Sequence, residues 1–142
     1  DSWPVEFITG LGLPNTTETD LDDLEEQVSA AFSQGTYHEP DPEFVEGLTA
    51  PWISEEGRTS LARCAVATNT NHTTEIDYGA ITADLLCLWG AEDSFQPIEY
   101  GKRLAEELDG EIIGLDDAYH WVMEDRTQRY IEELQKFLGN DE

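Results

Sequence analysis

The sequence predicts an α/β fold, with a parallel sheet in its second half and a mostly helical region before it. Residues 85–89 form a continuous apolar run, short enough to be a strand, which Gly90 ends. A second apolar run follows at residues 112–115, and a stretch with helical spacing separates the two runs. Strands without polar alternation are typical of a parallel sheet that helices cover on both faces.

The first 80 residues are predicted to form helices. Apolar residues recur at helical spacing over residues 20–34, after carboxylates that favour a helix start. A second helix should begin at Asp41-Pro42-Glu43, and a third at Ser54-Glu55-Glu56. The third helix is expected to bury the residues on one side of it, namely Leu61, Cys64, Ala65 and Thr68.

Residues 81–142 are predicted to form a strand–helix–strand–helix unit. The first helix of this unit should run from Pro97 to about Leu108, between the two apolar runs. Two strands joined by a helix are expected to be parallel. The last helix should bury an apolar face made of Tyr130, Ile131, Leu134, Phe137 and Leu138.

The charge of the chain is strongly acidic and is spread along its whole length. The 142 residues include 32 acidic and 7 basic side chains, which gives a formal net charge of −25. An acidic surface of this kind is used by halophilic proteins, because molar salt screens the repulsion between like charges. Nucleic acid is not expected as a partner, since no basic patch could meet its phosphates.

Two cysteines, Cys64 and Cys87, are expected to be reduced, buried thiols, which indicates a cytoplasmic protein. No stretch approaches the roughly 18 apolar residues of a membrane span. We expect neither a cofactor nor a metal, because His72 and Glu75 are too isolated for a metal site. His38 and His72 lie in polar loops and are expected to be solvated.

The chemistry is predicted to reside where the two strands end. Asp93 follows the first strand, and His120 follows the second strand 27 residues later. Open α/β sheets hold their active sites at the carboxyl ends of their strands. A carboxylate and an imidazole in this position can form an acid–base pair. The alternative interpretation of Asp93 is a helix-capping acid before Pro97, and Asp116 and Asp117 could be surface acids or could raise the basicity of His120.

These motifs resemble the C-terminal part of an α/β-hydrolase. The resemblance covers about residues 84–138, and it depends on LWGAEDSFQP at 88–97, AYHWVMED at 118–125 and QKFL at 135–138. Residues 3–81 are similar, less specifically, to the cap domain of such enzymes. The resemblance implies that Asp93 is the acid and His120 the base of a catalytic triad, with Asp1 as an alternative acid.

One part of the family pattern is missing from the sequence. The nucleophile elbow, G-x-S-x-G or its Asp and Cys variants, precedes the acid and the base in the family, and these 142 residues contain none. A complete capped hydrolase would need about 200–250 residues or more. We therefore interpret the chain as the cap plus the C-terminal half of a longer hydrolase, inactive alone. Its partner would be the N-terminal half or another copy of the chain.

The resemblance implies hydrolysis of a small molecule, either an ester or a C–C bond next to a carbonyl. His-Trp at residues 120–121 resembles the C–C bond hydrolases, so Trp121 is a candidate substrate contact. Arg58, Arg63 and Trp52 of the cap region are weaker candidates, since a guanidinium could hold a substrate carboxylate. The alternatives are a haloalkane dehalogenase-type enzyme with an Asp nucleophile and a pseudoenzyme that only binds a small ligand.

Overall fold

The computed structural model describes residues 14–67 and 75–139. The chain divides into two compact units. The first unit contains residues up to Gln34 and from Asp41 to Ile76, and the second contains Gly35–Pro40 together with the chain from Asp77 onward. The short segment Gly35–Pro40 therefore belongs with a part of the chain that lies far from it in sequence.

The first unit is helical. Its small hydrophobic core is formed by Leu24, Val28 and Leu61. Side-chain caps start two of its helices, because Asp20 accepts a hydrogen bond from the Asp22 N–H and Asp41 accepts one from the Glu43 N–H. Its elements are α2 (Pro14–Glu18), α3 (Leu21–Ser33), α4 (Pro42–Thr49), the 3-10 helix η1 (Ala50–Trp52) and α5 (Glu55–Ala67). The role of this region as a cap stays a prediction.

The buried side of α5 differs from the predicted one. Leu61, Ala62 and Ala65 are buried, whereas Cys64 is exposed. Ala62 lies about 100° from Leu61 around the helix axis, on the side away from Cys64, so the buried stripe is displaced away from Cys64. The prediction that Cys64 is a buried thiol is therefore wrong, while Cys87 is buried as predicted. Thr68 lies outside the described residues.

The second unit contains the sheet. Its elements are the 3-10 helix η3 (Tyr78–Ala80), β1 (Leu86–Gly90), α6 (Glu99–Glu107), β2 (Glu111–Leu115), α7 (Val122–Asp125) and α8 (Thr127–Phe137). The two strands are parallel, as predicted, and Leu88 pairs with Ile113. Among the described residues, β2 is the only strand that pairs with β1. The four-residue helix α7 was not predicted from the sequence.

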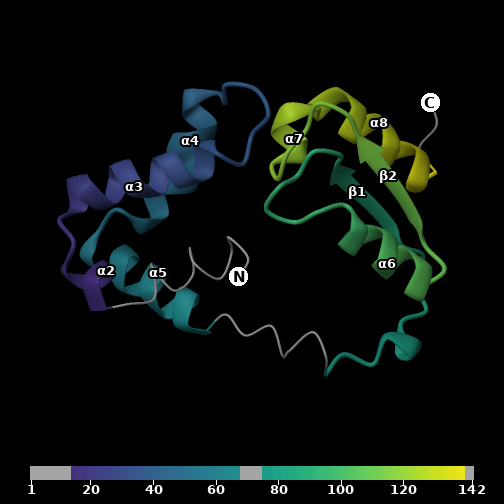
Figure 1. Ribbon diagram of the computed structural model, residues 1–142, viewed down its shortest axis with the longest axis horizontal. Coiled ribbons are helices and arrows are strands. Elements are labelled where there is room, and N and C mark those ends of the chain that lie inside the picture. Colours follow the sequence, from purple (N-terminus) through teal and green to yellow (C-terminus); the bar gives the residue numbers. More distant parts are fainter. Residues whose placement is uncertain (1–13, 68–74, 140–142) are drawn as a thin grey trace. The chain divides into compact units, whose positions relative to one another are not determined.

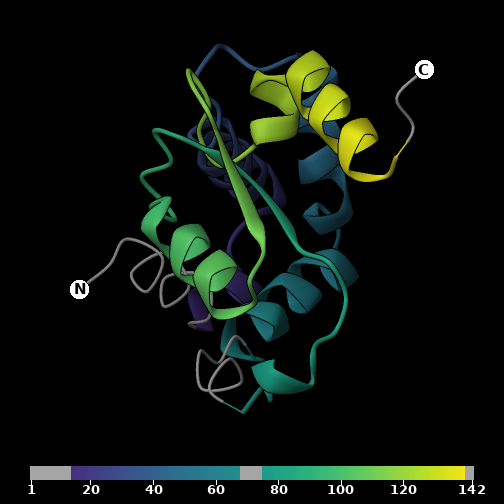
Figure 2. The same cartoon turned by 90° about the vertical axis from the view of Figure 1, so that its right-hand side faces the viewer.

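Helices lie on both faces of this sheet. In the two views, α6 lies on one face, and α7 and α8 lie on the other (Figures 1 and 2). Gly101 lets α6 approach closely, because a β-carbon there would come within 2.6 Å of the Trp89 ring and 2.8 Å of Ile112. On the opposite face, Leu115, Ala118 and Val122 form a buried cluster. The arrangement places the sheet between helices, as the unbroken apolar strands predicted.

The predicted buried face of α8 is largely exposed. Tyr130 packs against the Leu115 cluster, but Ile131, Leu134, Phe137 and Leu138 are 37–60% exposed. The helical period identified the apolar side of α8 correctly, but no described element covers it. The buried residue on α8 is instead Glu133, which forms ion pairs with Arg129 and Lys136. No helix in the described ranges is long and apolar enough to cross a membrane.

Candidate active site

The loops that follow β1 and β2 lie side by side at the carboxyl end of the sheet. Gly90 ends β1, and a β-carbon on it would overlap the backbone carbonyls of Ala118 and Tyr119. The Ala91 N–H donates to the Leu115 carbonyl at 2.9 Å, which continues the parallel pairing to the ends of the strands. A residue without a side chain at position 90 thus lets the second loop cross directly over the end of the first strand.

Asp93 and His120 form a hydrogen-bonded pair. The distance between His120 Nδ1 and Asp93 Oδ2 is 3.0 Å. The other oxygen of Asp93 accepts hydrogen bonds from the backbone N–H groups of Phe95 at 2.8 Å and Gln96 at 3.0 Å. Asp93 is only 8% exposed, whereas the His120 side chain is 31% exposed. The two residues lie close together, as predicted, whereas their catalytic roles remain a prediction.

Two opposing effects act on the Asp93 carboxyl. Burial raises the pKa of Asp93. The hydrogen bond and charge of His120, together with the N–H groups of Gln96 and Phe95, lower this pKa by more than burial raises it, so the net pKa lies below its ordinary value. The carboxylate is consequently ionised at neutral pH and can only accept a hydrogen bond. His120 Nδ1 must therefore carry the proton, which leaves Nε2 as the hydrogen-bond acceptor in the neutral ring.

Aromatic rings flank the imidazole on two sides. The centre of the Phe95 ring lies 5.6 Å from that of His120, and Trp121 makes an edge-on contact at 5.0 Å. A groove of about 240 Å³ opens beside the pair. It is lined by Leu88, Trp89, Gly90, Asp93, Gln96, His120, Val122, Met123 and Tyr130. The pair is therefore accessible from a mainly apolar groove, which is a suitable surface for an organic ligand.

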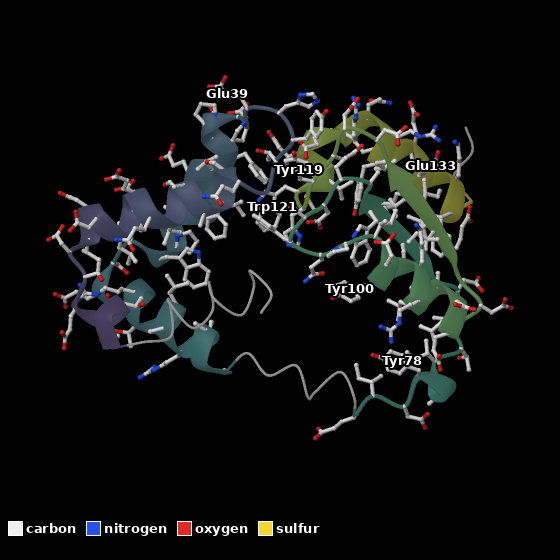
Figure 3. The ribbon with its side chains drawn as sticks, viewed as in Figure 1. Glu39, Tyr78, Tyr100, Tyr119, Trp121 and Glu133 are labelled. Atoms are coloured by element: carbon white, nitrogen blue, oxygen red, sulfur yellow. The ribbon has the colours of Figure 1, made fainter. Side chains whose placement is uncertain are left out.

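The structure brings together only some of the predicted site residues. Trp121 is adjacent to His120, and Tyr119 and Trp121 extend from the loop between β2 and α7 (Figure 3). Arg58 and Trp52 belong to the first unit, where Arg58 donates a hydrogen bond to the Thr19 carbonyl and Trp52 packs against the small core. Arg63 is exposed on α5. The substrate contacts proposed for these residues stay predictions.

Other predicted candidates have structural contacts or lie outside the described residues. Asp1 and His72 are not among the described residues. His38 is exposed, as predicted. Asp117 pairs with Arg126, and its backbone has φ of 55°, a left-handed conformation that Asp tolerates. Among the described residues, no group of three or more His, Cys, Asp or Glu side chains could hold a metal ion.

Two acidic residues support residues 116–121 between β2 and α7, which carry His120 and which we call the histidine loop. Neither of them was identified from the sequence. Glu92 Oε2 accepts a hydrogen bond from the Ala118 N–H at 3.3 Å, and the Glu92 N–H donates to the Ala118 carbonyl at 3.3 Å. Asp125 accepts a hydrogen bond from the Tyr119 N–H at 2.9 Å. In a chain with 32 acidic residues, neither carboxylate stands out by its type or spacing.

Comparison with solved structures identifies the fold. The chain superposes on the crystal structure of an alpha/beta hydrolase fold protein from Burkholderia ambifaria with a TM-score of 0.83. The fold is that of an α/β-hydrolase. The alignment covers 96% of this chain at 21% sequence identity, and this chain spans 51% of the solved one. Neither the known protein-family models nor the curated protein sequences gave a match.

The likeness agrees with the fold predicted from the sequence motifs. The matched chain is about twice as long as this one, so an α/β-hydrolase fold of that size includes parts that these 142 residues do not supply. At this level of identity the likeness concerns the fold alone. The reaction and the site residues therefore have to be argued from the geometry at the ends of β1 and β2.

Proposed function

We propose that this chain supplies the acid and the base of a nucleophile–His–Asp triad in a hydrolase. The observation that carries the proposal is the 3.0 Å hydrogen bond between Asp93 and His120 at the carboxyl ends of two parallel strands. Asp93 fixes the tautomer of His120, so that Nε2 can accept a proton from a nucleophile. The partly exposed imidazole lines the groove, where a nucleophile and a substrate could approach it.

In the proposed mechanism, His120 acts first as a base and then as an acid. Nε2 takes the proton of a hydroxyl nucleophile while the nucleophile attacks an acyl or carbonyl carbon. Asp93 remains ionised and stabilises the imidazolium, which then protonates the leaving group. Water, deprotonated by Nε2 in a second step, then attacks the bound acyl group, and the imidazolium returns the proton to the nucleophile as it leaves. The substrate would be an ester, or a compound with a C–C bond next to a carbonyl. Trp121 would contact it from beside His120.

The nucleophile has to come from another polypeptide segment, because the sequence has no nucleophile elbow. We infer that this segment belongs to the complementary half of the fold and adds a strand to the edge of β1 that no strand among residues 14–67 and 75–139 occupies. A second groove, of about 320 Å³, runs along β1 and α8 between Leu86–Trp89, Tyr130, Leu134 and Phe137. An unpaired strand edge next to apolar side chains is a template for another strand.

The proposal is tested by adding the missing segment. We would express this chain with the polypeptide encoded upstream of it and assay p-nitrophenyl esters, using the chain alone as the baseline. The chain alone should not exceed the rate of free imidazole. The assembly should turn over, and His120→Ala should reduce its rate by about 10³–10⁴-fold. Asp116→Asn is the matched control, because the Asp116 side chain is exposed and makes no hydrogen bond or ion pair to any described residue.

Four results would contradict or redirect the proposal. Full activity in His120→Ala would rule out the triad. Release of halide from a haloalkane, with an Asp in the supplied segment, would favour the dehalogenase-type reaction. Binding of a small ligand without turnover would favour a pseudoenzyme. Association of this chain with itself, without any complementary segment, would show that a second copy occupies the edge of β1.

A further inference from the structure

The backbone on both sides of His120 is tied to residues 35–40, a segment that we call the strap. On the C-terminal side, the Trp121 N–H donates to the Gly35 carbonyl at 2.8 Å. The Trp121 indole covers Gly35 so closely that a β-carbon there would lie 2.5 Å from its Nε1 atom. The strap and the histidine loop therefore meet both through the backbone and through the Trp121 ring.

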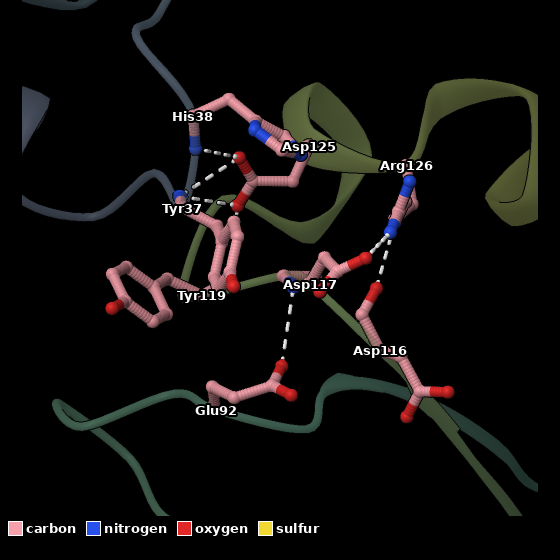
Figure 4. Close-up of polar contacts among 9 residues, drawn as sticks. Tyr37, His38, Glu92, Asp116, Asp117, Tyr119, Asp125 and Arg126 are labelled. Carbon is pink, nitrogen blue, oxygen red and sulfur yellow. Dashed lines mark hydrogen bonds and ion pairs between the residues drawn. The ribbon is translucent and has the colours of Figure 1, made fainter.

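The contact on the N-terminal side passes through the Asp125 carboxylate. Asp125 Oδ2 accepts hydrogen bonds from the N–H groups of Tyr119 and Tyr37, both at 2.9 Å. Oδ1 accepts hydrogen bonds from Tyr37 at 2.8 Å and His38 at 3.2 Å. Figure 4 shows the carboxylate facing the backbone nitrogens of Tyr37 and His38 in the strap. One side chain thus binds three backbone donors.

Two features separate this arrangement from ordinary helix capping. Asp125 is the last residue of α7, yet its side-chain bonds lead away from that helix to residues 88, 87 and 6 positions distant in sequence. The Tyr37 ring also packs edge-on against the Tyr119 ring, with centroids 5.1 Å apart. The carboxylate therefore lies at the junction of the strap and the histidine loop.

We propose that Asp125 is the positioning residue for His120: it holds the Tyr119 backbone on one side of the imidazole and the strap, which holds Trp121, on the other. The significance for catalysis rests on the proposed function of His120, but the positioning itself does not. A carboxylate suits this role because it offers two acceptor oxygens and a negative charge to three N–H groups. An amide at this position has a single acceptor oxygen, and its NH₂ group would oppose the remaining donors.

The experiment uses NMR on the 142-residue chain, with Asp125→Ala, Asp125→Asn and Asp116→Asn as variants. Asp125→Ala should speed amide exchange at Tyr119 and Trp121 by about tenfold or more, since a hydrogen bond to a charged group contributes at least that factor to an equilibrium. The pKa of Asp93, followed by the ¹³C shift of its carboxyl, should rise towards its ordinary value as His120 moves away. Asp125→Asn should give smaller changes of the same sign, and Asp116→Asn none.

The Asp93 titration distinguishes positioning from a purely structural role. Faster exchange at Tyr119 with an unchanged Asp93 titration would overturn the proposal, because the loop would then have loosened without moving the imidazole. If Asp125→Ala fails to fold, amide exchange and the Asp93 titration in Asp125→Asn distinguish the two roles instead. Neither measurement requires turnover. A chain that never becomes active with any upstream segment, but shows these shifts, would refute the proposed hydrolase and leave the positioning role intact.

Discussion

The backbone carbonyl of Tyr119 lies directly against the α-carbon of Gly90, with no space for a side chain between them. Gly90 is the last residue of β1, and Tyr119 directly precedes His120. This contact fixes how closely the histidine loop approaches the loop that carries Asp93. In this arrangement His120 Nδ1 lies 3.0 Å from Asp93 Oδ2.

Gly90→Ala should therefore destabilise the second unit. The added methyl group would collide with a backbone carbonyl, which cannot rotate away as a side chain can. We expect the free energy of unfolding to fall by about 1–3 kcal/mol, the usual cost of overpacking. Urea denaturation would measure this change, and ¹H–¹⁵N spectra should show shifts at Tyr119 and His120.

Gly47→Ala is the matched control. Gly47 lies inside α4, and a β-carbon there would have nothing within 4 Å. The substitution should raise stability by up to about 1 kcal/mol, because Ala favours a helix more than Gly does. If Gly90→Ala and Gly47→Ala changed the free energy of unfolding equally, the close contact at Gly90 would not constrain the histidine loop.

Asp93→Asn should make the stability less dependent on pH. The pKa of Asp93 is lowered in the folded chain, so its ionised form stabilises the fold above the unfolded pKa of about 3.9. That contribution is lost as the pH falls through the lower folded pKa. Asn keeps the oxygen that accepts from Phe95 and Gln96 but removes the charge facing His120.

The test compares urea denaturation of the two proteins between pH 7 and pH 3. At pH 7, Asp93→Asn should be less stable by about 1–3 kcal/mol, and the difference should shrink below about pH 4. Asp116→Asn controls for the loss of one negative charge. A constant difference between Asp93→Asn and the wild type at every pH would contradict the charged hydrogen bond.

Leu134→Gln should weaken assembly with the complementary segment without destabilising the chain alone. Leu134 is 37% exposed and lines the groove beside β1. Loss of this contact in an assembly should raise the dissociation constant by about three- to sixfold. Fully burying a Leu side chain contributes about 1.5–3 kcal/mol, and only the third of Leu134 that is still exposed remains to be buried. Titration calorimetry would measure the difference.

Ile131→Gln provides the control for this surface. Ile131 is 42% exposed on the same helix but lines neither of the two grooves beside β1. It should leave the dissociation constant unchanged within about a factor of two, as expected for a surface substitution away from the contact. Equal weakening by both substitutions would place the partner elsewhere on α8.

The sequence predicted the parts of this chain that depend on local pattern. β1 and β2 followed from their apolar runs, and the proximity of Asp93 and His120 followed from the rule that parallel strands end at the same edge. The contact of Asp125 with Tyr37 joins residues 88 positions apart, and no local pattern reports such a pairing. The exposure of Leu134 was missed for a similar reason, because helical periodicity identifies an apolar face but not what covers it.

The net charge of −25 leads to the last prediction, a strong dependence of stability on salt. The charged pairs among the described residues engage few of the 32 acidic side chains, so most of the repulsion must be screened by ions. At 0.01 M ionic strength the Debye length is about 30 Å, and at 1 M it is about 3 Å. We expect the melting temperature to rise continuously from dilute buffer to molar KCl, as in a protein adapted to high salt.

A variant with four exposed glutamates replaced by glutamine separates screening from other effects of salt. Glu25, Glu26, Glu106 and Glu107 are all exposed on α3 and α6. The replacement removes four negative charges without touching the core, so the variant should melt higher than the wild type in dilute buffer and converge with it in molar KCl. If ion exclusion from apolar surface were responsible instead, the two proteins would respond to KCl with the same slope. A melting temperature independent of salt in both would remove the halophilic interpretation, because unscreened repulsion at this charge density must lower the stability of the compact state.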